Sequence, residues 1–90
     1  MIAQKRDVNE AELITLWRGV GAVVIPMDKS AGFDLLVLHR GEVYIVEVKQ
    51  EGKYRMTDAE RYRACQVELA GVPYSIIQTA DDALKMLGLR

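Results

Sequence analysis

The chain has 90 residues, half of them hydrophobic, and a formal net charge of −1. This length suits one domain, residues 1–90, near the small end of what folds alone. The balanced charge gives no overall attraction to nucleic acid, although it is compatible with a local basic patch. No apolar run is long enough to span a membrane, and no signal-peptide pattern is present. The chain has one cysteine, Cys65, which excludes an internal disulfide and favours the cytosol. With His39 as its single histidine, the sequence also argues against a structural zinc site.

A helix is predicted to begin near Asn9. Asn9 with Glu12 fits an N-cap and its capping-box partner, and Asp7 with Glu10 is an alternative frame. Residues 13–20 then carry a broad apolar stripe at helical spacing. Glu10 falls at the edge of this stripe and Glu12 further round, toward solvent. A carboxylate at the edge is either favoured by the helix dipole or directed into a site, and for the second role we favour Glu10.

Three strands are predicted to follow, at 22–26, 32–38 and 43–49. Pro26 indicates that the first strand is at an edge of the sheet or ends there. The short turn 39–42 joins the second and third strands as an antiparallel hairpin. The third strand is apolar on both sides, which predicts that both of its faces are buried. Glu47 and Lys49 share the face of Ile45, because side chains alternate along a strand.

The second helix is predicted to start at Thr57, with Glu60 completing a capping box, and to end at Gly71. Its inner face is predicted to carry four residues: Tyr62, Cys65, Gln66 and Leu69. A fourth strand is expected at 73–78. Thr79 with Asp82 then caps a last helix. The predicted order is α-β-β-β-α-β-α.

The hairpin brings two carboxylates and an ammonium together. Asp34 begins its first strand, Glu47 ends its second, and antiparallel pairing places these two ends side by side, next to Lys49. Charges at the end of an apolar strand are costly unless they are paired, hydrated or bound to a metal. Either the strand exits into solvent at Glu47, or this end is a site for a hard cation such as Mg²⁺, which prefers carboxylate oxygens and water.

Asp34 followed by Glu47-Val48-Lys49 resembles the D…(D/E)-x-K signature of the PD-(D/E)XK nuclease superfamily. Over nearly the whole chain, the spacing is most similar to the minimal stand-alone VRR-Nuc domains of phages and bacteria, with archaeal-type Holliday junction resolvases as more distant relatives. The family usually has proline before the motif aspartate, where this chain has Phe33. The resemblance implies a restriction-endonuclease-like α/β (α+β) fold: an αβββαβ core with a mixed four-stranded sheet flanked by helices, plus a C-terminal helix.

The resemblance also implies a Mg²⁺- or Mn²⁺-dependent endonuclease that hydrolyses DNA phosphodiesters without a small-molecule cofactor. Asp34 and Glu47 would contact the metal, and the carbonyl of Val48 would add a further ligand. Glu10 would bind a second metal or a metal-held water. Lys49, kept charged by the two carboxylates, would orient the attacking water or stabilise the phosphorane.

Basic and polar residues near these positions are candidates for contacts with the DNA backbone. Two lie in the loop before Asp34, two flank Tyr54 in the loop after Lys49, and one lies on the second helix. An ordinary solvated surface is the alternative explanation for each. The candidates are Lys29, Ser30, Lys53, Arg55 and Arg61.

The stand-alone VRR-Nuc resemblance points to branched DNA, most of all four-way (Holliday) junctions, cut by a symmetric homodimer in a bacterial or phage-infected cytosol. Two-fold symmetry would place one active site on each of two opposite strands. The dimer interface would come from Trp17, Val23, Ile25 or the last helix. Three alternatives stay open: a flap, fork or non-specific nuclease of the same fold; a non-catalytic DNA-binding module that needs a partner; and a subunit of a larger complex whose Glu47 and Lys49 form a surface ion pair.

Overall fold

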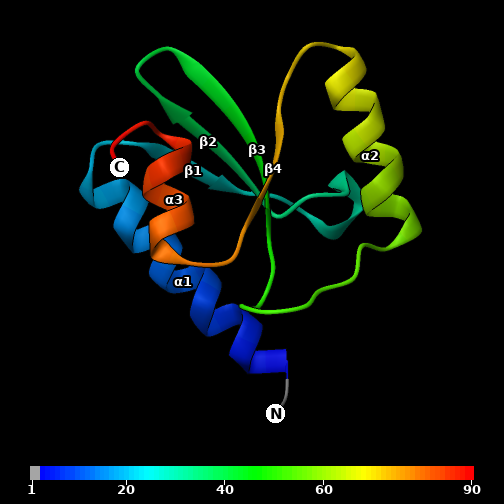
Figure 1. Ribbon diagram of the computed structural model, residues 1–90, viewed down its shortest axis with the longest axis horizontal. Helices are drawn as coiled ribbons and strands as arrows, with labels where there is room; N and C mark the ends of the chain where they lie inside the picture. Colours follow the sequence, from blue (N-terminus) through cyan, green and yellow to red (C-terminus); the bar gives the residue numbers. More distant parts are fainter. Residues whose placement is uncertain (1–2) are drawn as a thin grey trace.

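The computed structural model describes the backbone of residues 3–90 and the side chains of residues 9–90. In chain order the elements are α1 (Ala3–Gly19), β1 (Val23–Pro26), a short 3₁₀ turn η1 (Lys29–Ala31), β2 (Leu35–His39), β3 (Glu42–Val48), α2 (Asp58–Leu69), β4 (Tyr74–Ile77) and α3 (Ala80–Met86). This is the predicted αβββαβ order followed by a C-terminal helix (Figure 1).

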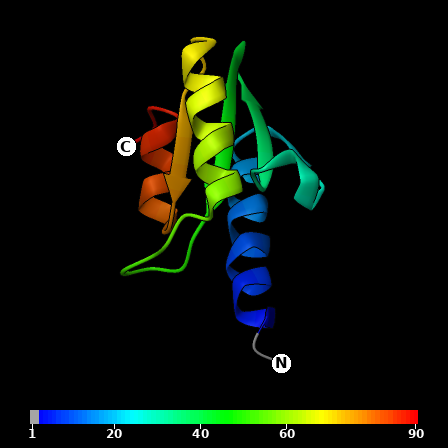
Figure 2. The ribbon, with the colours of Figure 1, turned by 90° about the vertical axis from the view of Figure 1, so that its right-hand side faces the viewer.

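The four strands form one mixed sheet in the order β1-β2-β3-β4. The first three strands are antiparallel neighbours, and β4 pairs parallel to β3. β1, which ends at Pro26, is therefore an edge strand, as that proline predicted. Helices α1 and α3 lie together on one side of the sheet, and α2 lies on the other (Figures 1 and 2). The predicted fold class is confirmed.

The core fills the space between the sheet and the pair α1 and α3. The indole Nε1 of Trp17 donates to the carbonyl of Ala83 at 3.2 Å, which ties α1 to α3 in the buried interior. The last four residues of β3 are buried on both faces of the sheet, as the apolar run predicted. The core side chains are Leu13, Trp17, Ala22, Val24, Leu35, Val37, Val46, Val48, Ile77, Ala83 and Leu87. No helix in the described part of the chain has the length and apolar character needed to cross a membrane.

The predicted start of the first helix is wrong. α1 begins at Ala3, so Asn9 lies inside it and caps nothing. The side chain of Asn9 instead donates from Nδ2 to the carbonyl of Lys49 at 3.5 Å. The apolar stripe begins only at Leu13, so the earlier turns carry no pattern that would reveal a helix. The side chain of Asp7, the alternative cap, lies outside the described residues.

The hairpin turn is shorter than predicted. Its two turn residues, Arg40 and Gly41, have φ of 51° and 83°, which is the conformation that matches the right-handed twist of two-residue hairpins. His39, predicted to lie in the turn, is the last residue of β2, pairs with Glu42 and is 6% exposed. Strand pairing thus continues up to the turn itself.

The predicted inner face of α2 is also wrong. Tyr62 is 66% exposed and Leu69 is 84% exposed, and no residue of the helix is fully buried. The half-buried side carries Glu60, Arg63, Ala64 and Val67. The aliphatic stem of Arg63 packs over Gly32, so a long charged side chain occupies the place that an apolar one was expected to fill. Both predicted capping boxes, at Thr57 and Thr79, are present.

Candidate active site

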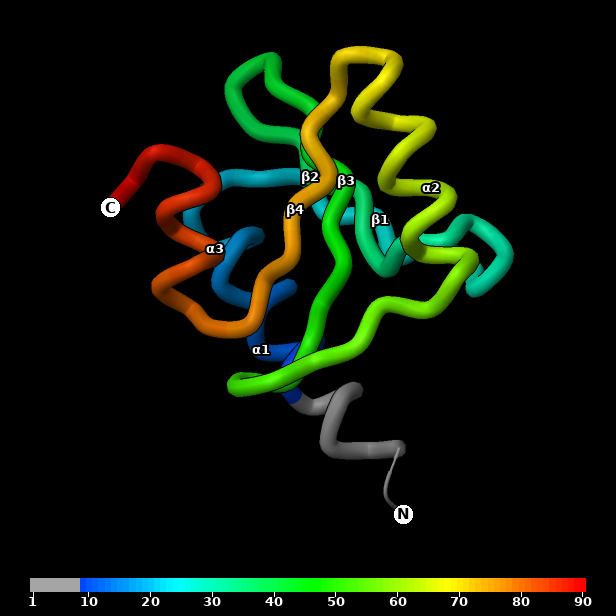
Figure 3. The backbone as a smooth tube through the Cα atoms, turned by 45° about the vertical axis from the view of Figure 1, so that its right-hand side comes forward, coloured from blue at the N-terminus to red at the C-terminus, as the bar shows by residue number. Residues whose placement is uncertain are grey.

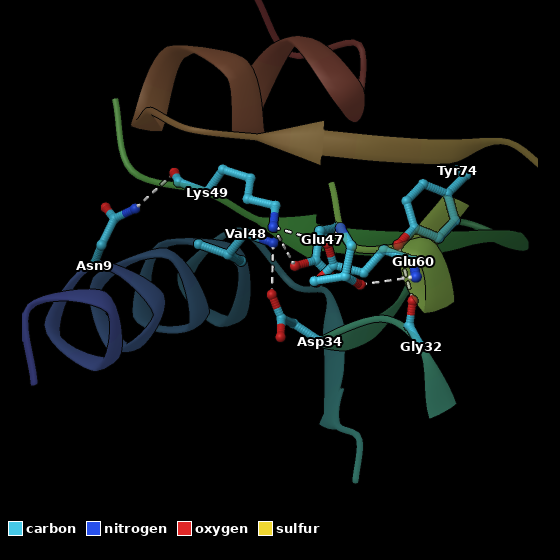
Figure 4. A network of polar contacts seen from close by, with 9 residues as sticks. Asn9, Gly32, Asp34, Glu47, Val48, Lys49, Glu60 and Tyr74 are labelled. Atoms are coloured by element: carbon cyan, nitrogen blue, oxygen red, sulfur yellow. Dashed lines mark hydrogen bonds and ion pairs between the residues drawn. The ribbon is translucent and has the colours of Figure 1, made fainter. Parts of the chain in front are cut away.

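Asp34 stands at the open end of the β2–β3 hairpin, one residue before β2. Its amide donates to the carbonyl of Val46 at 2.9 Å. Its carboxylate oxygen Oδ2 accepts a hydrogen bond from the amide of Val48 at 2.8 Å. These two bonds fix the Asp34 carboxylate beside the end of β3 that carries Glu47 and Lys49 (Figure 4). The predicted meeting of the two strand ends is therefore present.

Glu47 is a buried carboxylate with only 1% of its surface exposed. Its Oε2 lies 3.4 Å from Nζ of Lys49. Burial raises the pKa of Glu47 to about 8, and the nearby Glu60 and Asp34 carboxylates act in the same direction, against the opposing effect of Lys49. A cation placed next to Glu47 would favour its charged form, so this carboxylate is suited to bind one.

Lys49 is held at three of its groups. Its amide donates to the carbonyl of Ile77 in β4 at 3.0 Å, and its carbonyl accepts from Asn9 of α1. Its ammonium donates to Oε1 of Glu60 at 2.9 Å. With 14% of its side chain exposed, the ammonium has a defined position beside the Asp34 and Glu47 carboxylates (Figure 4).

Glu60 is a site residue to which the sequence assigned only a helix-capping role. Its Oε1 accepts both the Lys49 ammonium and the backbone amide of Thr57, each at 2.9 Å. Burial alone would raise the pKa of Glu60, but the hydrogen bonds from Lys49 and Thr57 outweigh it and lower that pKa. The capping box was visible in the sequence; the contact with Lys49 could not be read from it, because the loop between them sets where α2 begins.

Tyr74 is a second residue missed by the sequence. Its hydroxyl donates to the carbonyl of Gly32 at 2.9 Å, across the gap between β4 and the loop that leads into Asp34. Burial, followed by the charges of Glu47, Glu60 and Asp34, raises the pKa of Tyr74, so the phenol keeps its proton. The same loop is held from α2, where Nε of Arg63 donates to the carbonyl of Ala31 at 2.7 Å. The chain segment before Asp34 is thus fastened from two elements.

Three of these residues, Asp34, Glu47 and Glu60, line a pocket of about 220 Å³. Among the predicted DNA-contact residues, Lys29 lines the pocket, whereas Lys53, Arg55 and Arg61 are exposed outside its lining. The hydroxyl of Ser30 donates to Asp28 at 2.8 Å, so this residue has a local structural role. The lining residues are Met27, Lys29, Gly32, Phe33, Asp34, Glu47, Thr57, Ala59 and Glu60.

The donor set fits a divalent cation with few protein ligands. Mg²⁺ is usually held by one or two carboxylates, with water and substrate phosphate completing its shell, and Asp34 and Glu47 supply two. Within residues 9–90, no three His, Cys, Asp or Glu side chains form a metal-binding group. Glu10 is half-buried on α1, and Glu12 is exposed. The part of Glu10 in metal binding, like that of the Val48 carbonyl, stays a prediction.

The tube trace in Figure 3 shows how the site is assembled from distant parts of the chain: the end of β3, the loop before β2 and the start of α2 converge on one side of the sheet. Every one of these segments contributes lining residues to the pocket. Because these segments are distant in sequence, the pocket forms only when the whole domain is folded.

Comparison with known proteins supports this architecture. No family model matches the chain, and no curated protein matches it in sequence. A solved structure described as "VRR_NUC domain" matches with a TM-score of 0.72 over 93% of this chain and 95% of that chain, at 20% identity. The fold of this protein is therefore that of a VRR_NUC domain, as the sequence resemblance predicted.

Proposed function

We propose that this protein is a metal-dependent nuclease that hydrolyses phosphodiester bonds in DNA. The observation that carries the proposal is the Lys49 ammonium, which lies 3.4 Å from the buried Glu47 carboxylate at the strand end where Asp34 is fixed. The Asp34 and Glu47 carboxylates line the pocket beside them, which gives a phosphate access to both. The VRR_NUC fold also supports the proposal. The residues that carry the sequence resemblance, Asp34, Glu47 and Lys49, lie together at this end of the sheet.

Asp34 and Glu47 are the residues that would hold Mg²⁺ or Mn²⁺, with the Val48 carbonyl as a further ligand and Glu10 for a second ion or its water. When bound, the ion lowers the pKa of a water molecule and neutralises charge on the phosphate. Lys49 directs its N–H groups to the attacking water or to a non-bridging phosphate oxygen, where negative charge develops in the transition state. Lys29, which also lines the pocket, attracts the DNA backbone.

A purely structural role for these charges is the competing explanation, and burial argues against it. Removing a carboxylate such as Glu47 from water costs free energy that an apolar residue at the same place would not. A binding module without catalysis has no need for that cost. A surface ion pair in a larger complex is also a poor description, because the Glu47 side chain is 1% exposed and that of Lys49 is 14% exposed.

The experiment is a cleavage assay on a labelled four-way junction, a flap, a linear duplex and a single strand, with Mg²⁺ or Mn²⁺. Lys49→Ala should lose about a hundredfold or more in rate while staying folded, as is typical when a donor to the charge that develops in the transition state is removed. Asp34→Asn should lose activity and also bind Mn²⁺ more weakly. Lys85→Ala, which removes an exposed lysine paired with Asp81 on α3, is the matched control and should cleave normally. Cleavage by Lys49→Ala at the wild-type rate would refute the assignment.

Branched DNA and a symmetric homodimer belong to the same proposal. Trp17 is 0% exposed and cannot form the interface, contrary to that sequence expectation. Val23 and Val43, 54% and 47% exposed, both pair with Leu38 and form an apolar row across three strands. Ile25, 42% exposed, lies in the next row. A two-fold contact through this surface would match apolar with apolar.

Light scattering tests the dimer. Wild type should have twice the chain mass of 10.1 kDa, and Val43→Glu should be monomeric, because a charge on this surface cannot be buried without a partner. A monomeric wild type at the concentration used for cleavage would contradict the dimer without touching the active site. The substrate panel decides between junctions and flaps, forks or unselective cleavage.

A further inference from the structure

The residues that line the pocket fall into two chemically different sets, an acidic wall and an apolar wall. One wall is formed by the three acids Asp34, Glu47 and Glu60. The other is apolar and consists of Met27, Phe33 and Ala59, with Lys29 also in the lining. Metal binding and phosphate hydrolysis need only the acidic wall and a cation. The apolar wall has no part in that chemistry and requires its own explanation.

Phe33 is in a fixed relation to the acidic wall. It directly precedes Asp34, whose amide and carboxylate are both bonded to β3. It directly follows Gly32, whose carbonyl accepts from the hydroxyl of Tyr74. An aromatic ring is therefore held one residue away from a proposed metal ligand, and a group resting on the ring would lie next to the reacting phosphate.

The chemistry of a nucleic acid identifies what such a wall can receive. In a continuous duplex the faces of the bases are stacked on one another, and only their edges are accessible in the grooves. A recessed wall cannot enter a groove, so a base must leave the stack to reach it. Unstacked bases, by contrast, are held on aromatic side chains while basic residues follow the backbone. Phe33 supplies the aromatic ring and Lys29 supplies the basic group.

The volume of the pocket limits the occupant to a small group. About 220 Å³ is less than the roughly 300–1,000 Å³ of pockets that enclose drug-sized ligands. This space suits a single nucleobase.

We propose that the pocket binds one unstacked nucleotide adjacent to the scissile phosphate, with its base against Phe33 and Met27. This inference rests on the proposed nuclease function and gives its substrate class: DNA with unpaired or readily unstacked nucleotides at the cleaved bond. Continuous duplex is a poor substrate, because it must first unstack a base. Phe33 is then a specificity-determining residue, at the position where the resembled family usually has proline.

The test measures DNA binding by fluorescence anisotropy in the presence of Mg²⁺. It uses the Lys49→Ala protein, which is expected to bind DNA without cutting it. The probes are a fully paired duplex, the same duplex with a short unpaired loop, and a single strand. We expect the looped and single-stranded probes to bind about tenfold more tightly than the duplex, and Phe33→Leu to remove about tenfold of this advantage, as loss of one base–aromatic stack predicts. Phe33→Tyr, which keeps the ring, should retain it.

Tyr62→Leu, which removes an exposed aromatic ring from α2, is the matched control and should leave the preference unchanged. Equal binding of all three probes, or an unchanged preference in a folded Phe33→Leu protein, would overturn the inference even if wild type cleaves DNA. The converse is distinguishable: wild type that cuts nothing, with the Phe33-dependent preference intact, would refute the nuclease and leave the nucleotide pocket standing.

Discussion

The ammonium of Lys49 lies 2.9 Å from Oε1 of Glu60, the same oxygen that accepts the amide of Thr57 at the first turn of α2. One carboxylate thus caps a helix and orients the proposed catalytic lysine. Glu47 of β3 contacts the same ammonium at 3.4 Å, so Lys49 pairs with one carboxylate from a strand and one from a helix. The position of α2 and the geometry of the site are therefore coupled through Lys49.

This coupling predicts that Glu60→Ala loses stability and activity together. The backbone amide of Thr57 loses its acceptor, at a cost of about 1 kcal/mol in the free energy of unfolding. The Lys49 ammonium loses its closest acceptor, which should reduce the cleavage rate about tenfold. Glu60→Gln keeps an amide oxygen for both bonds and should retain the stability of the cap and much of the rate. Urea unfolding and cleavage rates measure the two effects.

Asp82→Ala provides the control for this prediction. Asp82 accepts the amides of Gln78 and Thr79 at the start of α3, as Glu60 accepts that of Thr57, and it forms no ion pair with any lysine among residues 9–90. It should lose comparable stability and keep the wild-type rate at a temperature where the protein is folded. If Asp82→Ala loses as much activity as Glu60→Ala, the effect of Glu60 is capping alone.

The metal-free protein should become less stable as pH rises from about 5 to 8. Glu47 has a pKa raised by burial to about 8, above its ordinary value of 4.5, so the folded state binds the proton more tightly than the unfolded state does. Glu47 therefore contributes fully to stability below the pKa that it has in the unfolded state. This contribution is lost as the pH rises through the pKa that it has in the folded state. Glu60, whose pKa is lowered, does not titrate in this window.

Thermal unfolding of wild type and Glu47→Gln in EDTA measures this effect. The wild-type melting temperature should fall by several degrees between pH 5 and 8 relative to the variant, because a neutral amide has no proton to lose. Other groups that titrate in this range contribute equally to both proteins. Parallel pH profiles would show that Glu47 is charged throughout.

Local patterns were sufficient to predict the hairpin and the meeting of Asp34 with Glu47. Both follow from alternation along two strands and from a short turn, which are properties of residues close in sequence. The order of elements followed from the same signals and from two capping boxes. The VRR-Nuc resemblance then implied a mixed four-stranded sheet. The strand order and the parallel pairing of β4 with β3 became visible only in the structure.

The roles of Glu60 and Tyr74 could not be predicted in this way. Each depends on a contact with a residue distant in sequence: Glu60 with Lys49, and Tyr74 with Gly32. The error on α2 has the same origin. Tyr62 and Leu69 looked like an inner face by periodicity, but both are exposed. The half-buried side of the helix mixes polar and apolar residues, and Glu60 on that side lines the pocket.

Tyr74→Phe should loosen the site without unfolding it. The substitution removes only the hydroxyl that donates to Gly32, and the ring keeps its packing. A typical hydrogen bond contributes about 1 kcal/mol, so stability should fall slightly. Freed from β4, the loop should hold Asp34 less firmly, and the Mn²⁺ concentration needed for half-maximal cleavage should rise about fivefold. Tyr62→Phe, on the exposed side of α2, should leave this concentration unchanged.

Gly32→Ala should be much more destabilising than Gly41→Ala, although both glycines have positive φ, 80° and 83°. A Cβ on Gly41 meets nothing within 4 Å, whereas one on Gly32 would lie 2.9 Å from Cβ of Arg63. Gly41→Ala therefore introduces backbone strain alone, which costs about 1 kcal/mol. Gly32→Ala adds about 1–3 kcal/mol for a clash with the Cβ of Arg63, which cannot move unless α2 moves with it. Urea unfolding measures the difference. Equal losses would mean that α2 shifts to make room for the added methyl group.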